Sequence, residues 1–184
     1  LTKGFYLGKY EVTQAQFEAV TGANPSQFNA TGNGNRPVEK VNWTEAVAFC
    51  TQLTTQEQNA GRLPAGWAYV LPTESQWEYA CRAGSSGRYS FGDSPRELAR
   101  FANFADAALL RQDSDFHYGD PTVDDGTGKR PAPIGSYQPN AWGIHDMHGN
   151  VIEICADGYL NALRGGLDPW VQRIKEGGVV IRGG

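Results

Sequence analysis

Several features that would point to particular classes of protein are scarce or missing in this sequence. No apolar run approaches the roughly 20 residues that a membrane-spanning helix needs. Basic residues are not in excess, because 16 Lys and Arg stand against 20 Asp and Glu, giving a net charge of -4. Binding to nucleic acid phosphates needs a clustered basic face, so the charge balance argues against a nucleic acid partner. The sequence therefore predicts neither a membrane span nor a nucleic-acid-binding protein.

Cysteine is also scarce, with only Cys50, Cys81 and Cys155 in 184 residues. An odd count leaves at least one thiol unpaired within this chain, which excludes a disulfide framework built from these residues alone. Cys50 and Cys81 stand beside apolar residues in segments with a helical pattern, where a small buried hydrophobic side chain is the favoured role.

Glycine and proline, in contrast, are abundant, with 23 and 10 residues respectively. This composition predicts many loops between short elements, and it argues against a helical bundle. A length of 184 residues is enough for one domain with a buried core. No linker or internal repeat divides the chain.

Four helix starts are marked by one capping pattern, in which a Ser, Thr or Asn precedes a Glu or Gln by three residues. The first side chain accepts an early backbone amide, and the second reaches back to the amide of the first. The pairs are Thr13 with Gln16, Asn42 with Glu45, Thr73 with Gln76 and Ser94 with Glu97, and the first three helices are expected to end near Gly22, Gly61 and Gly84.

Four short segments have the composition of β-strands, and antiparallel pairing is favoured over a parallel sheet. They are residues 5–12, 134–137, 151–154 and 179–182. Residues 105–133, in contrast, are polar and have little periodicity. So long a structureless segment is either a mobile excursion or is held by something other than hydrophobic burial, for which a bound cation is the obvious candidate.

Asp146 and Glu153 flank Gly149, which permits a turn between them. This arrangement can wrap oxygen ligands around a hard cation, and calcium takes six to eight oxygens, some of them backbone carbonyls. The alternative is that the two acids accept local hydrogen bonds and cap turns. The residues alone leave both interpretations open.

Two further pairs of side chains could form a metal site or an acid–base catalytic site. His145 and His148 can share one face, but a closed zinc site needs four ligands and neither a nearby cysteine nor His117 completes one, which favours a turn or surface role. Glu74 and Glu78 stand one helical turn apart, as paired acid–base carboxylates could. Glu74 lies in a first helical turn, where the helix dipole favours negative charge, so a structural role is favoured.

Three motifs carry a resemblance to a known family: Leu71-Pro-Thr-Glu-Ser-Gln-Trp-Glu-Tyr-Ala-Cys-Arg-Ala-Gly84, Pro139-Asn-Ala-Trp-Gly-Ile-His-Asp-Met-His-Gly-Asn-Val-Ile-Glu-Ile154 and Val180-Ile-Arg-Gly-Gly184. Their order and spacing resemble the formylglycine-generating enzyme (sulfatase-modifying factor) family over nearly the whole chain. The resemblance implies the variant of the C-type-lectin-like fold found in that family, which is α+β with short antiparallel strands, few helices and long loops. We expect residues 1–184 to form a single domain of this kind, truncated at both ends relative to the family.

The resemblance also implies two calcium sites. The first takes the side chains of Asp146 and Glu153 and the carbonyls of Gly149 and Val151. The second site consists of Asn103, Phe104, Asp125 and Thr127. The first site brings two formal negative charges and the second site brings one, so the first site is expected to bind calcium more tightly.

Catalysis in the family, as the resemblance implies it, uses oxygen and copper held by two cysteine thiolates to oxidise a sulfatase cysteine to Cα-formylglycine. Those cysteines are expected after the Arg-Gly-Gly motif, beyond Gly184, so no catalytic residue is assigned and copper is expected only if that pair exists.

One departure from the family lies at Ile152 and Ile154, where the usual motif has two Trp residues. Neighbouring side chains are expected to repack around the smaller residues.

Three hypotheses for function follow from the resemblance. The first is a sulfatase-modifying oxidase whose reactive segment follows Gly184. The second is a non-catalytic binding or accessory domain that recognises a protein, peptide or ligand, as part of a larger bacterial assembly. The third is a relative with other metal-dependent oxidative chemistry, such as a sulfoxide-synthase-like domain. The habit of the family and the availability of calcium favour a periplasmic or secreted location.

Overall fold

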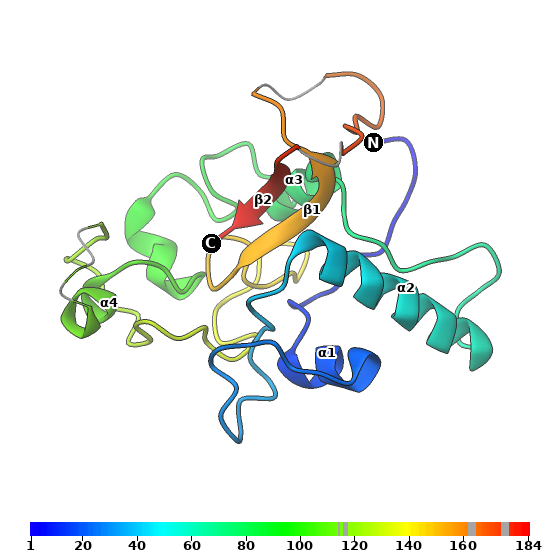
Figure 1. Ribbon diagram of the computed structural model, residues 1–184. Helices are drawn as coiled ribbons and strands as arrows, with labels where there is room; N and C mark the ends of the chain where they lie inside the picture. Colours follow the sequence, from blue (N-terminus) through cyan, green and yellow to red (C-terminus); the bar gives the residue numbers. More distant parts are fainter. Residues whose placement is uncertain (114, 116–117, 162–164, 174–176) are drawn as a thin grey trace.

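The computed structural model describes residues 1–113, 115, 118–161, 165–173 and 177–184. A short sheet occupies the centre, with helices and long loops around it (Figure 1). Helix α3 packs against both strands, and α1 packs against α2. In chain order the elements are α1 (Gln14–Thr21), α2 (Trp43–Asn59), α3 (Glu74–Arg82), the 3-10 helix η1 (Pro95–Arg100), α4 (Ala107–Gln112), β1 (Ile152–Gly158) and β2 (Val179–Gly183).

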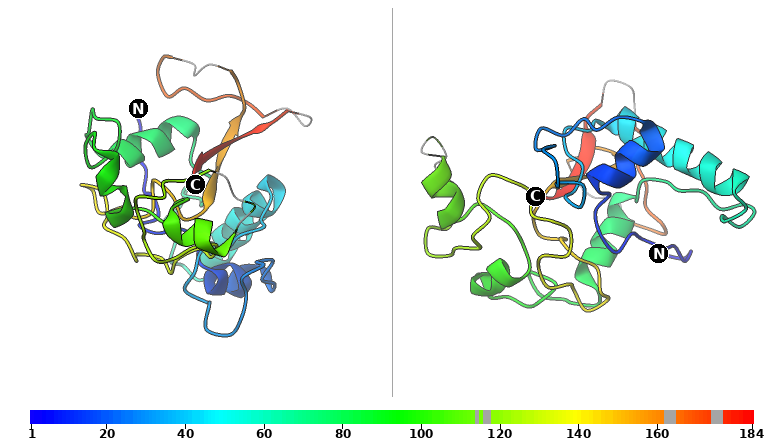
Figure 2. Two further views of the ribbon diagram at one scale, coloured as in Figure 1. Left: turned by 90° about the vertical axis from the view of Figure 1, so that its left-hand side faces the viewer. Right: turned by 90° about the horizontal axis from the view of Figure 1, so that it is seen from below.

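The view from below in Figure 2 places α1 and α2 at the opposite end of the molecule from α4, with the sheet between them. Most of the chain around α4 and η1 is loop. The architecture is therefore α+β with little regular secondary structure, as the resemblance implied. None of the helices in the described ranges combines the length and the hydropathy that crossing a membrane requires.

Three of the four predicted helix starts are confirmed as reciprocal capping boxes. Thr13 Oγ1 accepts the Gln16 N–H at 3.2 Å, and Gln16 Oε1 accepts the Thr13 N–H at 3.0 Å. Asn42 and Thr73 cap α2 and α3 in the same way. The fourth start differs, because Ser94 makes no side-chain cap and the segment that follows is the 3-10 helix η1.

The two strands pair antiparallel, which confirms the prediction for residues 151–154 and 179–182. Ile152 lies opposite Gly183 and Ile154 opposite Ile181, and the register shifts before Gly158. Two other predicted strands are wrong. Residues 5–12 do not form a strand, because the Lys9 carbonyl accepts the His145 N–H and the Val12 carbonyl accepts the Val38 N–H, from two different loops.

Residues 134–137 form a turn, since Gly135 adopts a positive φ of 71°. Within residues 105–133 the structure has a helix, α4, that the sequence pattern did not predict. Its start is capped by Asp106, whose carboxylate accepts the N–H groups of Ala108 at 2.8 Å and Leu109 at 3.1 Å. The segment is therefore not structureless, and a local carboxylate cap organises part of it.

The core joins α3 to both strands and to one loop. Trp77 and Cys81 of α3 pack with Cys155 of β1, Val180 of β2 and Met147 of the loop before β1. Full burial of a large apolar side chain stabilises a fold by about 1.5–3 kcal/mol. Met147 is 5% exposed, so the loop that carries Asp146 is anchored to the core.

Candidate metal-binding site

The loop from Asp146 to Glu153 is held in an unusual backbone conformation. Asp146 and Asn150 both have positive φ angles, of 61° and 76°. The loop also passes very close to the chain at Asn103, because a Cβ atom at Gly149 would overlap the Asn103 carbonyl oxygen. Glycine at this position allows the loop to touch the segment that carries the second predicted site.

Asn150 ties three distant segments together. Its N–H donates to the Asn103 carbonyl at 2.8 Å, and its side-chain Oδ1 accepts the Ala132 N–H at 2.6 Å. Its Nδ2 donates to Glu11 Oε2 at 2.7 Å. Asn150 thereby joins the loop to the N-terminal segment, which the sequence analysis did not foresee.

Asp146, four residues before Asn150, is 1% exposed. Its Oδ2 accepts the Gly135 N–H at 3.3 Å. Its Oδ1 is buried and has no hydrogen-bond partner among the described residues, and the same holds for Glu11 Oε1. A buried carboxylate oxygen without a partner destabilises the folded state, so a ligand that binds either oxygen would be stabilising.

Burial raises the pKa of all three acids in this region, Glu11, Asp146 and Glu153. Burial raises the pKa of Glu11 to about 9, and the charges of Asp146 and Glu153 add to the rise. Burial, with a smaller contribution from Asp146, also raises the pKa of Glu153 to about 7. Burial raises the pKa of Asp146, although the Gly135 N–H and His145 oppose it. None of the ion pairs in the described chain involves these three acids.

A calcium ion fits the chemistry of this first set. Buried carboxylate oxygens without partners are hard ligands of the kind that calcium prefers. Across the described residues, no group of three or more His, Cys, Asp or Glu side chains converges closely enough to hold a metal by side chains alone. Backbone carbonyls would therefore have to complete the shell, as the resemblance implied for Gly149 and Val151.

The four residues of the second predicted set also lie together. The Asp125 carboxylate accepts the Thr127 N–H at 2.7 Å and the Phe104 N–H at 3.4 Å. The Asn103 side chain donates to the Arg130 carbonyl at 3.0 Å. Burial raises the pKa of Asp125. Here the carboxylate already serves as a turn acceptor, which is the alternative that the sequence left open.

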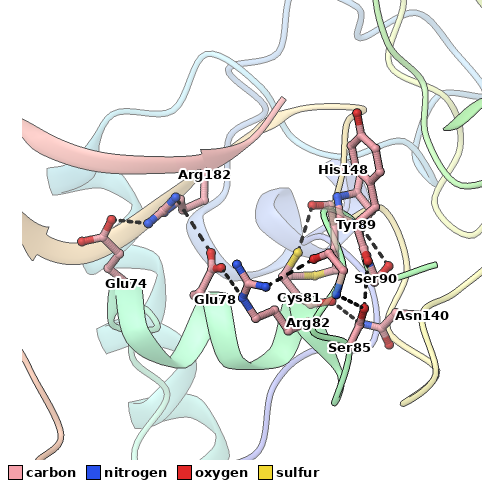
Figure 3. A network of polar contacts seen from close by, with 12 residues as sticks. Glu74, Glu78, Cys81, Arg82, Ser85, Tyr89, Ser90, Asn140, His148 and Arg182 are labelled. Carbon is pink, nitrogen blue, oxygen red and sulfur yellow. Dashed lines mark hydrogen bonds and ion pairs between the residues drawn. The ribbon is translucent and has the colours of Figure 1, made fainter. Parts of the chain in front are cut away.

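The two predicted histidine positions do not converge on a common ligand. His145 Nδ1 lies 2.8 Å from the Tyr137 carbonyl oxygen. His148 Nε2 lies 2.9 Å from Ser90 Oγ and 3.2 Å from the Ser90 nitrogen, a contact visible in Figure 3. His117 lies outside the described residues.

The carboxylates of α3 are engaged in ion pairs. Glu74 pairs with Arg182 of β2, and Glu78 pairs with Arg82 at 2.7 Å (Figure 3). Arg182 also approaches Glu78 at 3.9 Å, so the network links α3 to the sheet. This geometry supports the structural role over acid–base chemistry.

The cysteines are free and poorly suited to metal or redox chemistry. No disulfide joins Cys50, Cys81 and Cys155. Burial raises the pKa of Cys81 and that of Cys155 to about 12, and it also raises the pKa of Cys50. Because the thiolate is the metal ligand and nucleophile, protonated buried thiols are inert at neutral pH.

A large apolar cleft of about 1940 Å³ opens between the N-terminal segment, α2 and the sheet. Its lining includes Tyr6, Trp67 and Ile181, which are 87%, 45% and 52% exposed. Ile152 and Ile154 also line it. Repacking of neighbours was expected around these two residues, but Ile152 is 59% exposed and lines this cleft.

Comparisons with known proteins agree on one family. The family model of the Sulfatase-modifying factor enzyme 1-like domain matches residues 1–184. The chain is 32% identical over 179 residues to the chaperone protein LppX of Paenibacillus barcinonensis, covering 82% of this chain and 61% of LppX. It is 35% identical over 134 residues to the formylglycine-generating enzyme of Streptomyces coelicolor, covering 72% of this chain and 35% of that enzyme.

A solved structure supports the same fold. Treponema denticola variable protein 1 superposes with a TM-score of 0.70 at 29% sequence identity, over 96% of this chain and 71% of that chain. The chain spans less than two thirds of the length of the two relatives named above.

Proposed function

The chain belongs to the family of sulfatase-modifying factor enzyme 1-like domains, and on that basis we propose that residues 1–184 form one calcium-stabilised domain that binds a polypeptide partner. Contacts between distant segments support a single domain. Thr2 donates to Asp168, Glu11 accepts from Asn150, and Arg36 donates to the Pro131 carbonyl.

The apolar cleft is the observation that carries the proposed binding role. An exposed apolar patch of this kind often marks the binding site of a folded domain. The cleft runs along the sheet, because Ile152 and Ile154 of β1 and Val179 and Ile181 of β2 line it, and a peptide in extended conformation can lie along such a surface. We therefore propose an extended apolar peptide segment as its occupant. The name of LppX, a chaperone, is consistent with a protein partner.

Selection of peptides tests the binding role. A library of random 12-residue peptides is selected on the calcium-loaded protein, and enriched peptides are measured by fluorescence anisotropy. Ile181→Asp places a charge in the cleft and is expected to weaken binding at least about 10-fold. Leu167→Asp is the control, since Leu167 is 84% exposed and does not line the cleft. Absence of enriched peptides, or equal binding to Ile181→Asp, contradicts the binding role.

Calcium supplies structural stabilisation in this proposal. Asp146 and Glu153 would hold the ion with the carbonyls of Gly149 and Val151, and the ion would neutralise two buried carboxylates that form no ion pair among the described residues. Asn103, Phe104, Asp125 and Thr127 would form a second, weaker site. Sites of this kind suit an extracytoplasmic bacterial setting, where calcium is abundant.

Chelation of calcium is expected to lower the melting temperature of the protein, and Asp146→Ala should remove that response. An unchanged melting curve in chelator contradicts the calcium proposal.

Oxidation of a sulfatase cysteine to Cα-formylglycine is the second candidate, favoured by the 35% identity to the Streptomyces coelicolor enzyme. The three cysteines described above do not supply it, because their thiols stay protonated. A copper-binding cysteine pair would have to come from elsewhere in the whole protein. The test incubates the full natural protein with copper, oxygen and a sulfatase-derived cysteine peptide, with mass spectrometry for the aldehyde. A whole protein that carries such a pair and forms no aldehyde contradicts this candidate.

A further inference from the structure

A second cavity, of about 680 Å³, lies against the N-terminal segment. It shares part of its wall, including Lys9, with the large apolar cleft, but Tyr79 and Trp142 belong to this cavity alone. Its volume falls within the roughly 300–1,000 Å³ that is typical of sites for small molecules. The chemistry of its wall indicates which kind of molecule would fit.

Two aromatic rings form one part of the wall. Tyr79 of α3 is 52% exposed and Trp142 is 49% exposed. Their ring centroids lie 4.9 Å apart with an interplanar angle of 60°. No ring fits between two rings this close, so a ligand would stack on an outer face. Exposed aromatic faces of this kind suit a ligand that itself carries a flat ring.

The aromatic pair is held in place by Asn140, which is 9% exposed and lies beside the end of α3 in Figure 3. Its Nδ2 donates to the Ala80 carbonyl at 2.8 Å and to the Cys81 carbonyl at 3.3 Å, both in the last turn of α3. Its Oδ1 accepts the Trp142 N–H at 3.0 Å. Asn140 therefore fixes the turn that carries Trp142 against the helix that carries Tyr79. A wall that is ordered in advance loses little freedom when a ligand binds.

The N-terminal segment forms another part of the wall and is attached at two points. The Thr2 N–H donates to the Asp168 carboxylate at 2.6 Å. The Lys9 carbonyl accepts the His145 N–H at 3.0 Å, which joins the segment to the loop that follows Trp142. Both walls of the cavity are therefore positioned by contacts between distant parts of the chain.

The charged side chains that line the cavity are both cations. Among the described residues Lys3 and Lys9 line it, and no Asp or Glu does. Neither lysine forms an ion pair within the described chain. The Lys9 ammonium lies 5.1 Å from the centroid of the Tyr10 ring, a contact that orients the charge without neutralising it. The Lys3 charge acts on Asp168, but Asp168 is outside the wall and is already bound by Thr2.

We propose that this cavity binds a small anion that carries a flat aromatic ring, with the ring stacked on Trp142 and the anionic group beside Lys9. Charge complementarity supports the anionic group, because the wall has cations and no acid in a chain whose net charge is -4. The exposed and ordered rings support the flat ring. This site needs neither calcium nor a peptide, so it is independent of the function proposed above.

Isothermal titration calorimetry with three anions that carry a ring tests the proposal. The probes are adenosine 5′-monophosphate, 1-naphthyl phosphate and indole-3-acetate, and at least one is expected to bind with a Kd below about 1 mM. The matching ring without the charge is adenosine, 1-naphthol or indole, and the charge without the ring is inorganic phosphate or acetate. Each of these parts should bind at least about 5-fold more weakly than the whole probe, because it uses only half of the wall.

Four variants locate the bound probe. Trp142→Ala removes the stacking face and should weaken binding at least about 5-fold. Trp67→Ala is its matched control, since Trp67 is 45% exposed and lines the large cleft but not this cavity. Lys9→Gln should weaken binding about 2- to 5-fold, as loss of an exposed ion pair does. Lys40→Gln is the control for charge, because Lys40 is exposed and does not line this cavity.

Ionic strength gives a readout that needs no substitution. Raising the salt concentration should weaken binding of the anionic probe, because salt screens exposed charges, and should leave binding of the neutral ring unchanged. An anionic probe whose affinity does not respond to salt contradicts the role of the lysines.

Each remaining outcome also decides the matter. If none of the three anions binds, the proposal is overturned. Equal losses in Trp142→Ala and Trp67→Ala, or a loss in Trp67→Ala alone, would place the probe in the large cleft and overturn the site. A probe that binds as tightly to Lys9→Gln as to Lys40→Gln, or as tightly without its anionic group, overturns the recognition of an anion.

Discussion

Gly149 is the residue at which the two predicted calcium sites meet. A side chain there would overlap the Asn103 carbonyl and come within 3.1 Å of the Ala102 Cβ. We expect Gly149→Ala to lower the free energy of unfolding by about 1–3 kcal/mol, as overpacking does, and to weaken calcium binding. Urea denaturation and calcium titration measure the two effects.

Gly4→Ala is the matched control, because a Cβ at Gly4 meets nothing within 4 Å. Its free energy of unfolding should stay within about 0.5 kcal/mol of the unmodified value. A Gly149→Ala variant as stable as Gly4→Ala would show that the loop does not need its close approach to Asn103.

At the scale of single residues, the sequence suggested Asp146 and Glu153 as calcium ligands through their spacing around a glycine, and this stays a prediction. It did not predict the contact that Glu11 makes, because the only signal was an acidic residue in a segment rich in apolar side chains. It also missed Asn150, which binds Glu11 across most of the chain. Spacing can suggest candidate ligands within one loop, whereas contacts between distant segments depend on the fold.

Helix α3 offers a test at the scale of an element. Thr73 caps its first turn and packs the helix start beside Asp157, whose carboxylate accepts the Glu74 N–H at 2.7 Å. Thr73→Ala is expected to destabilise the protein by about 1 kcal/mol. Ser94→Ala is the control, because Ser94 precedes η1 without a side-chain cap, and it should change the free energy of unfolding by less than about 0.5 kcal/mol.

Urea denaturation of both variants gives the comparison. Equal losses would mean that the capping hydrogen bonds seen at Thr73 do not contribute to stability.

The difference between local and long-range interactions explains which elements the sequence could predict. Capping boxes are local, so Thr13, Asn42 and Thr73 were recognised from four residues each, whereas a strand exists only if a partner pairs with it. Residues 5–12 have strand composition but no pairing partner among the described residues.

At the scale of the whole molecule, the labelling rate of a buried cysteine measures how often the folded protein opens. Cys155 is fully buried in the core and Cys81 is 8% exposed, whereas Cys50 is less buried. The pKa of all three thiols is raised, so iodoacetamide reacts slowly with each and reaches Cys155 only when the core opens. In the native protein we therefore expect Cys50 to be labelled first and Cys155 last.

Calcium is expected to extend this protection through the whole fold. At a calcium concentration 100 times the Kd, binding stabilises the folded state by about 2.7 kcal/mol, so labelling of Cys155 should slow about 100-fold when opening is in rapid equilibrium. Labelling of Cys50 in the folded state should change little, and Asp146→Asn should remove the effect at Cys155. Mass spectrometry of timed samples measures all three rates. If Cys155 is labelled as fast with calcium as without it, the ion does not stabilise the core that joins α3, β1 and β2.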